Sequence, residues 1–428
     1  MVLLQLAASV KTLFRFAEIG KVTIDSPVAR LHHNFTVGLL LLCSLLVTTS
    51  DLIGKSIECI PGTKLVGQGV KAATQYCYMQ HTFTVKKHFA SCDFGSVCDR
   101  KVIGLDVPHH GVGPVVLDSR DPDEVAYTTY YIWVPFVLFF QAGLFYAPHW
   151  LWKMWENGVT KTLTSGLMGK TATRDALAEK TAPVASYMAR SWHTHEMYAY
   201  RYLLCEVLAL VNVLGNLWFV NWFLGGAFME YGSQVLQFSN MDPEERTDPM
   251  IMLFPRITKC TFLSVGPSGT FQKSDFLCIL AANIINEKVY IFLWFWFLLL
   301  AIVTLVNICF RLSPALSYAA KLWFLQQRAG HTSDLNALQR VASRSKLGDF
   351  YIMYFLSQNM SCGTFGNFVD SLDVALEEEK RMPLFPNHPD EDDDAVEGGN
   401  HHDAPTMPKG YVKTALTELG LVDKPEQV

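Results

Sequence analysis

The sequence lacks the residue patterns on which enzyme chemistry depends. It shows no serine, histidine and acid set of a hydrolase, and no pair of carboxylates expected to share a pocket. Among the neighbouring histidines, three pairs have no cysteine or carboxylate set at metal-ligand spacing. These pairs are His109 with His110, His193 with His195, and His401 with His402. We therefore expect no catalytic residue, no cofactor and no metal site.

Charged residues are also scarce, at 18% of the 428 residues, whereas soluble domains average about 25%. Much of the net charge of -5 comes from two acidic runs, residues 377–379 and 390–394. Nothing in the chain suggests the basic surface that a nucleic acid would bind. A nucleic-acid partner is therefore not expected.

Hydrophobic residues, in contrast, make up 50% of the chain and gather in four blocks. The fourth block contains 21 consecutive residues without a charge, from Tyr290 to Phe310. At about 1.5 Å per residue they span about 31 Å as a helix, close to the ~30 Å hydrocarbon core of a bilayer. The blocks, at 35–53, 131–152, 202–224 and 289–310, predict an all-α membrane protein with four transmembrane helices.

Four cysteines lie between these blocks in two pairs with one spacing. Cys59 and Cys77 follow the first block, and Cys260 and Cys278 precede the fourth, each pair 18 positions apart. An even number of spans places both pairs on one side of the membrane, and disulfides persist only in an oxidising compartment. The cysteine loops should therefore be extracellular.

The connectivity of these cysteines stays open, because four cysteines allow three pairings. Equal spacing suits an antiparallel ladder between the loops, Cys59 with Cys278 and Cys77 with Cys260. The alternative is one bridge inside each loop. Cys92 and Cys98 form a further pair in the first loop, and a local bridge is expected if they are oxidised.

The distribution of basic residues predicts the same orientation independently. Residues 311–348 carry six basic residues against one acidic residue, whereas the second cysteine loop, 226–288, carries five against seven. Basic residues concentrate on the cytoplasmic side of membrane proteins. Both termini and the middle loop should therefore lie in the cytoplasm.

These signals divide the chain into ten segments. An N-terminal segment, 1–34, has apolar residues at helical spacing, which predicts an amphipathic helix that either lies on the inner leaflet or folds into a channel mouth. Ser333 or Asp334 would cap a helix in the second cytoplasmic region. The acidic, proline-rich tail should be disordered. After 1–34 the order is a first span (35–53), extracellular loop 1 (54–130), a second span (131–152), a cytoplasmic loop (153–201), a third span (202–224), extracellular loop 2 (225–288), a fourth span (289–310), a cytoplasmic helical region (311–379) and the tail (380–428).

Several motifs resemble those of one family. The second span opens with Tyr130, Tyr131, Ile132, Trp133, Val134 and Pro135, which is similar to the innexin signature Tyr-Tyr-Gln-Trp-Val. The stretch from Thr258 to Phe297 resembles insect innexins almost residue for residue, and the likeness covers about residues 20–375. Ile132 in place of the glutamine and the extra pair Cys92 and Cys98 depart from the family pattern.

This resemblance implies a subunit of a large-pore gap junction channel. Innexin-like subunits would form a homo- or hetero-oligomeric ring, of eight, in the lipid of the plasma membrane. The ring would dock with one in the neighbouring cell and pass ions and small solutes. The resemblance further implies the antiparallel inter-loop disulfides, a helical cytoplasmic dome and an N-terminal pore funnel. Funnel candidates are Leu3, Gln5, Leu6 and Ser9.

Two other functions compete with this one. The first is an undocked hemichannel that releases small metabolites, as the related pannexins do. The absence of glycosylation motifs from both outer loops favours docking, because a glycan there would hinder it. The second is a four-span adhesion or scaffold protein like claudins or tetraspanins, whose Gly-Leu-Trp and Cys-Cys-Gly signatures are missing.

Overall fold

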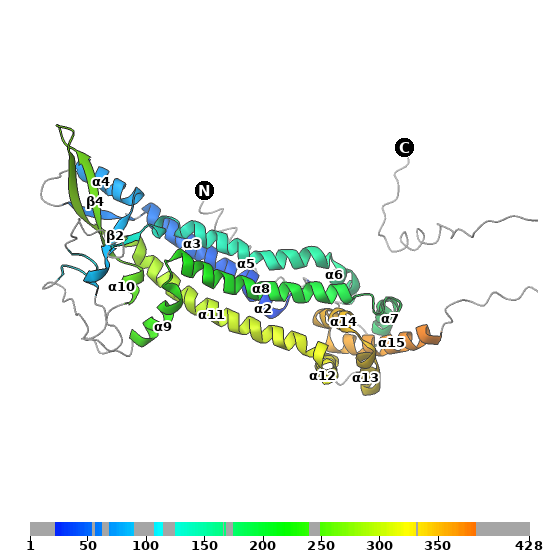
Figure 1. Ribbon diagram of the computed structural model, residues 1–428. Helices are drawn as coiled ribbons and strands as arrows, with labels where there is room; N and C mark the ends of the chain where they lie inside the picture. The colour runs from blue at the N-terminus through cyan, green and yellow to red at the C-terminus, as the bar shows by residue number, and fades with distance from the viewer. Residues whose placement is uncertain are drawn as a thin grey trace, which may run out of the picture. The chain divides into compact units, whose positions relative to one another are not determined.

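Four long helices run side by side through the computed structural model, which describes residues 22–53, 56–61, 68–89, 107–113, 125–165, 167, 174–238, 249–330 and 333–381 (Figure 1). Each is long and apolar enough to cross a membrane, which confirms the predicted four-span helical fold. The four candidate spans are Pro27–Ser50, Val134–Glu156, Glu196–Phe223 and Ala281–Leu316.

The first span begins at a capped turn. Ser26 is the N-cap of α2 (Pro27–Arg30), and its hydroxyl accepts a hydrogen bond from the Ala29 amide at 2.9 Å. Pro27 fits the first turn, where no backbone donor is needed. The helix then widens into a π-helical turn, η1 (Leu31–Thr36), before it continues as α3 (Val37–Ile53). Such π turns are uncommon and often lie at functional sites.

The other spans are α5 (Val134–Glu156), α8 (Glu196–Phe223) and α11 (Ala281–Leu316). At 36 residues, α11 is about 54 Å long and therefore exceeds the ~30 Å hydrocarbon layer. The helices thus extend beyond the apolar blocks, because hydropathy marks only the part that lies in lipid. Large apolar side chains also cover the outside of the bundle, as expected for helices that face lipid: Trp218, Phe139 and Ile302 are exposed.

At one end of the bundle, the sheet end, the chain forms a five-stranded antiparallel sheet with the order β1-β5-β4-β2-β3. The strands come from both cysteine loops, for which the sequence analysis predicts no strand. Their bounds are β1 (Glu58–Pro61), β2 (Thr82–Val85), β3 (Val125–Thr128), β4 (Ile257–Val265) and β5 (Phe271–Ile279). The short helices there are α4 (Gln68–Met79), η2 (Lys86–His88), η4 (Tyr130–Ile132), α9 (Phe228–Phe238) and α10 (Pro249–Leu253).

At the opposite end, the helical end, six helices pack together. They are α6 (Val159–Thr164), α7 (Arg174–Arg190), α12 (Tyr318–Ala329), α13 (Leu335–Arg344), α14 (Leu347–Asn359) and α15 (Cys362–Arg381). Helix α14 lies at the centre, where every residue from Gly348 to Ser357 is buried. Asp334, rather than Ser333, caps α13 by accepting from the Asn336 amide at 3.2 Å.

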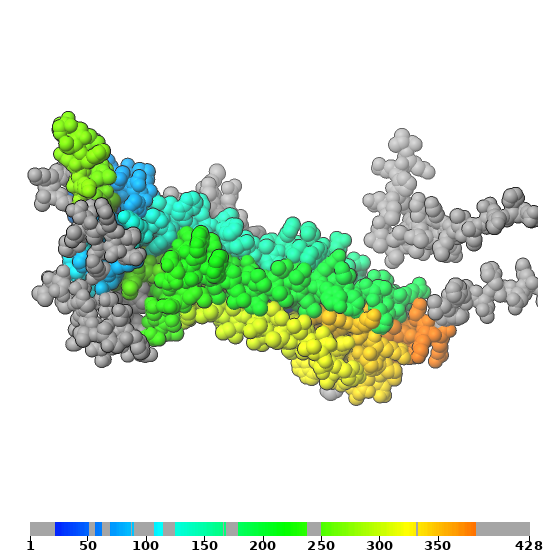
Figure 2. All heavy atoms as spheres, viewed as in Figure 1, coloured from blue at the N-terminus to red at the C-terminus, as the bar shows by residue number. Residues whose placement is uncertain are grey.

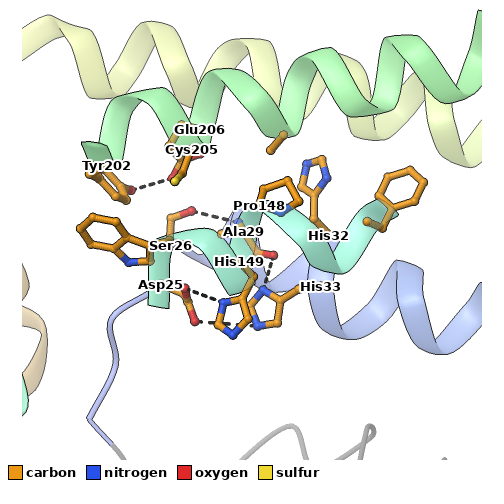
Figure 3. Close-up of a pocket in the computed structure, with 13 residues that line it drawn as sticks. Asp25, Ser26, Ala29, His32, His33, Pro148, His149, Tyr202, Cys205 and Glu206 are labelled. Carbon is orange, nitrogen blue, oxygen red and sulfur yellow. Dashed lines mark hydrogen bonds and ion pairs between the residues drawn. The ribbon is translucent and has the colours of Figure 1, made fainter. Parts of the chain in front are cut away.

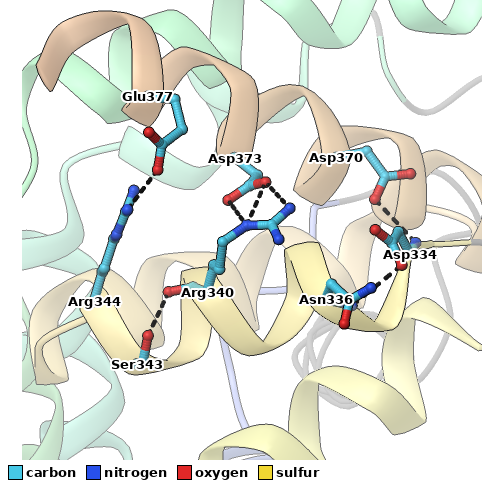
Figure 4. Close-up of polar contacts among 8 residues, drawn as sticks. All are labelled: Asp334, Asn336, Arg340, Ser343, Arg344, Asp370, Asp373 and Glu377. Atoms are coloured by element: carbon cyan, nitrogen blue, oxygen red, sulfur yellow. Dashed lines mark hydrogen bonds and ion pairs between the residues drawn. The ribbon is translucent and has the colours of Figure 1, made fainter. Parts of the chain in front are cut away.

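Ion pairs join α13 to α15 along their length (Figure 4). The Arg340 guanidinium donates to both carboxylate oxygens of Asp373, at 2.6 to 3.2 Å, and Arg344 pairs with Glu377. The arginines are four residues apart, as are the acids, so both pairs lie on the same helix faces. Residues 382–428, which include most of the predicted tail, lie outside the described residues.

A buried aspartate joins α14 to the segment before α8, and its loss should destabilise the helical end. The Asp349 carboxylate accepts from the backbone amides of His193 and Lys346 and contacts the His193 and His195 rings. Asp349→Asn removes the negative charge that accepts these bonds. The free energy of unfolding should therefore fall by about 1–3 kcal/mol at neutral pH. Chemical unfolding of the purified chain would measure this loss.

The same aspartate predicts a dependence on pH. Burial alone would raise the pKa of Asp349, but the nearby His195 ring and the hydrogen bonds from His193 and Lys346 outweigh it and hold the pKa below its usual range. A pKa that is lower in the folded chain than in the unfolded chain stabilises the fold at pH values above the ordinary aspartate pKa of about 4. This stability is lost as the pH falls through the pKa that Asp349 has in the folded chain. The parent should therefore lose more stability below pH ~4 than Asp349→Asn does. Equal acid sensitivity of both proteins would contradict this role.

Candidate functional site

Two disulfide bonds hold the sheet end together. Cys59 on β1 bonds to Cys278 on β5, and Cys77 on α4 bonds to Cys260 on β4. All four cysteines are buried. The bonds therefore link the first cysteine loop to the second, which is the antiparallel pairing among the possible connectivities. Cys92 and Cys98 lie outside the described residues.

Strand register explains this pairing. β1 runs antiparallel to β5 with Cys59 directly opposite Cys278, so that their Cα atoms are 4.0 Å apart. β4 runs antiparallel to β5 on its other side, and α4 packs against β1 and β4, which brings Cys77 to Cys260. Apolar side chains surround the bonds: Ile57, Ala73, Tyr131, Phe276 and Leu280 are buried in the same cluster.

The signature residues connect this sheet to the second span. The Tyr131 hydroxyl donates to the Tyr78 carbonyl oxygen at 3.2 Å, and burial raises the pKa of Tyr131 to about 12. The Tyr130 hydroxyl donates to the Leu253 carbonyl oxygen at 2.9 Å. Each tyrosine thus ties the start of α5 to a different loop.

The remaining signature residues have separate roles. Pro135 lies in the first turn of α5, where its missing amide costs little, and its carbonyl oxygen accepts from the Ser44 hydroxyl at 2.9 Å. Val134 is buried in the bundle core, whereas Trp133 is exposed. Ile132, which replaces the expected glutamine, packs against the disulfide cluster.

The hairpin of β4 and β5 projects at the sheet end as a separate arm (Figure 2). Its turn is built on Gly266 and Gly269; Gly269 has a φ of 81°, which favours glycine. Beside the turn, Val265 pairs with Phe271, and these side chains are 68% and 80% exposed. With Leu263 two residues earlier on the same strand face, they form an apolar surface that we call the tip patch.

An ionic cluster around one buried glutamate supports the base of this hairpin. Arg256, immediately before β4, donates from Nε and Nη2 to one Glu287 oxygen, at 3.0 and 2.7 Å. Lys288 donates to the other oxygen at 2.7 Å. Glu287 has no exposed side chain surface and lies on α11, so the cluster fixes the start of the hairpin to the fourth span.

Similar proteins identify the family. The family model with the description Innexin matches residues 25–375 of this chain. The chain belongs to the innexin family. Innexin inx2 of Schistocerca americana is 39% identical over 369 residues, which cover 86% of this chain and 97% of the relative. Innexin inx3 of Drosophila melanogaster is 38% identical over 370 residues, covering 86% of this chain and 89% of the relative.

A third relative, innexin shaking-B of Drosophila melanogaster, is 38% identical over 355 residues, covering 83% of this chain and 91% of that protein. Innexins are gap junction channel subunits rather than enzymes, so this innexin is a subunit of a gap junction channel in a cell membrane. The funnel candidates Leu3, Gln5, Leu6 and Ser9 lie outside the described residues.

The tip patch and the Glu287 cluster were not identified as functional from the sequence of this innexin. Burial alternates only in part along β4: Cys260 is buried on one face, and Leu263 and Val265 are exposed on the other. The irregular alternation gives little sequence signal for the tip patch. Arg256 and Glu287 are 31 residues apart, and no spacing rule connects them. Both features depend on how the second loop folds onto α11.

Proposed function

We propose that this innexin assembles, with copies of itself or with other innexins, into a ring of eight subunits in the plasma membrane. The ring docks end to end with a ring of the neighbouring cell. Ions and small solutes then diffuse between the two cytoplasms through the shared pore. The sheet end faces the extracellular space, and the helical end and both termini lie in the cytoplasm.

The disulfide-bonded sheet is the observation that carries this proposal. Docking requires an extracellular surface that keeps one shape without a large core of its own, and disulfides supply such rigidity in small extracellular elements. Here two disulfides, a buried apolar cluster and the Glu287 cluster fix a hairpin that ends in an exposed apolar patch. Contiguous exposed apolar residues often mark a protein contact.

The cytoplasmic funnel is a second part of the proposal. The first described residues lie against the helical end: Thr23 exchanges two hydrogen bonds with the Asn359 amide group, at 2.7 and 2.8 Å, and the Trp152 indole donates to the Ile24 carbonyl oxygen. The segment before them therefore starts from a fixed point beside α14. We infer that Leu3, Gln5, Leu6 and Ser9 line the narrow part of the pore.

Dye transfer between paired cells tests the proposal. Cells that express the chain, when brought into contact, should pass a small fluorescent dye to each other, whereas pairs in which neither cell expresses it should not. The dye must be retained by single expressing cells in the same medium. Dye loss from single cells without transfer between pairs would contradict docking and establish the undocked hemichannel instead.

A further inference from the structure

One helix of the helical end, α14, contacts the ends of all four spans. The helix is buried from Gly348 to Ser357, so most of its side chains pack against other parts of the chain. Four residues of α14 each contact a different span or the segment that leads into it: Asp349, Tyr351, Phe355 and Asn359. α14 therefore relates the positions of the four spans to one another.

Three of these contacts reach the second, third and fourth spans. The Phe355 ring stacks on the Trp152 ring of α5, with their centroids 5.9 Å apart. The Asp349 carboxylate accepts from a backbone amide of the segment before α8 at 3.1 Å. The Tyr351 hydroxyl donates to the Arg311 carbonyl oxygen of α11 at 2.7 Å. Because protein interiors are close-packed and transmit strain, a shift of α14 would displace these three spans together.

The contact with the first span is made to the backbone alone. Asn359 is the last residue of α14, and its side-chain amide accepts from the Thr23 amide at 2.7 Å and donates to the Thr23 carbonyl oxygen at 2.8 Å. The same side-chain nitrogen donates to the Phe355 carbonyl oxygen at 2.8 Å, which fixes the amide on its own helix. We call the two bonds to Thr23 the Asn359 clamp. Only an amide side chain supplies both the donor and the acceptor that this clamp requires.

The clamp acts on a short segment that leads directly into the first span. The Ile24 carbonyl oxygen accepts from the Trp152 indole at 2.9 Å. The Asp25 carboxylate lies 3.1 Å from His149 of α5, and Ser26 caps α2 (Figure 3). Each residue between the clamp and α2 is thus bonded in place, so a displacement of the clamp is passed on to the first span.

We propose that Asn359 is a positioning residue of the channel: through the clamp, α14 sets where the first span starts, and the helical end thereby controls how readily the pore conducts. The inference rests on the proposed function, because it requires a pore between cells. Loss of the clamp would free the start of the first span and leave the other three spans in contact with α14. The first spans of a ring would then start at unequal positions, and the ring would conduct less.

Hydrogen exchange of the full chain in detergent, followed by mass spectrometry, tests the clamp. In Asn359→Leu, the peptide that contains Thr23 should exchange at least about tenfold faster than in the parent, because two net hydrogen bonds are lost. Thr23→Val is the matched control, since it changes the side chain and keeps both backbone groups that Asn359 contacts. Peptides from the buried part of α14 should exchange at the parental rate in both variants. Equal exchange at Thr23 in the parent and in Asn359→Leu would overturn the inference.

Transjunctional current between paired cells tests the positioning role. At equal surface amounts, Asn359→Leu pairs should carry about tenfold less current than parental pairs, and Thr23→Val pairs should carry the parental current. Asn359→Asp is an isosteric second variant in case leucine loosens α14. It should also reduce the current, because its carboxylate lacks the donor and repels the Thr23 carbonyl oxygen.

The outcomes separate this inference from the proposed function. Parental current in Asn359→Leu and Asn359→Asp, beside a parent that conducts, would overturn the positioning role alone. A parent that carries no current between paired cells would overturn the proposed function, and this inference with it, whatever the exchange at Thr23.

Discussion

Loss of the Cys59–Cys278 bond should reduce dye transfer between paired cells to background. The double variant Cys59→Ser/Cys278→Ser removes the covalent link between β1 and β5, whose residues are 219 positions apart. Removing a native disulfide from a small extracellular element costs on the order of 2–5 kcal/mol, a large part of its stability. β1 pairs with β5 through only four residues, which are too few to hold β1 against the sheet without the bond.

A cysteine outside the two disulfide bonds supplies the control. Cys362, exposed on α15, forms no disulfide, so Cys362→Ser should transfer dye at the parental rate. Surface biotinylation of each variant separates a failure to dock from a failure to reach the surface. Parental transfer by the Cys59→Ser/Cys278→Ser variant would show that this bond does not support the docking surface.

The transmembrane part of the fold was predictable because lipid leaves the backbone few choices. An apolar run of about 20 residues must satisfy its own hydrogen bonds, which makes it a helix, and all four such runs are confirmed as helices. Helix ends were harder to predict. Helix α8 starts at Glu196 and α11 ends at Leu316, because packing at the helical end continues both helices beyond the apolar blocks.

The sheet end was less predictable, because its contacts join distant parts of the chain. β1 pairs with β5 although more than 200 residues separate Cys59 from Cys278. Spacing alone permits three cysteine connectivities, and only the strand register distinguishes them. The irregular alternation along β4 is a weak signal, because strand propensity depends on what each face packs against.

The polar clusters of the bundle were not predictable for the same reason. Asp25 and His149 are 124 residues apart, so no motif contains both. Glu206 on α8 accepts from Tyr202 at 2.6 Å and from Asn307 on α11 at 2.9 Å. Asn307 reaches Glu206 only because α8 and α11 pack against each other. A sequence identifies such ionisable residues as notable but does not supply their neighbours.

A charge in the tip patch should separate docking from ring assembly. Phe271→Asp places a carboxylate at the most exposed apolar position of the hairpin, opposite Val265. Because Phe271 is 80% exposed, the change should leave the subunit folded and the ring intact. In a docked pair the carboxylate would be buried without a partner, at about 1–3 kcal/mol per subunit, and every 1.4 kcal/mol is tenfold in the docking equilibrium.

Dye transfer by Phe271→Asp should therefore fall more than tenfold, and purified particles should change from paired rings to single rings in projection images. The matched control is Gln272→Asp, which adds the same charge one residue further along β5, on the opposite face of the hairpin. It should keep both transfer and paired rings. If Phe271→Asp also transfers dye like the parent, the tip patch lies outside the docking contact. If it abolishes the rings themselves, the patch is a contact between neighbouring subunits of one ring.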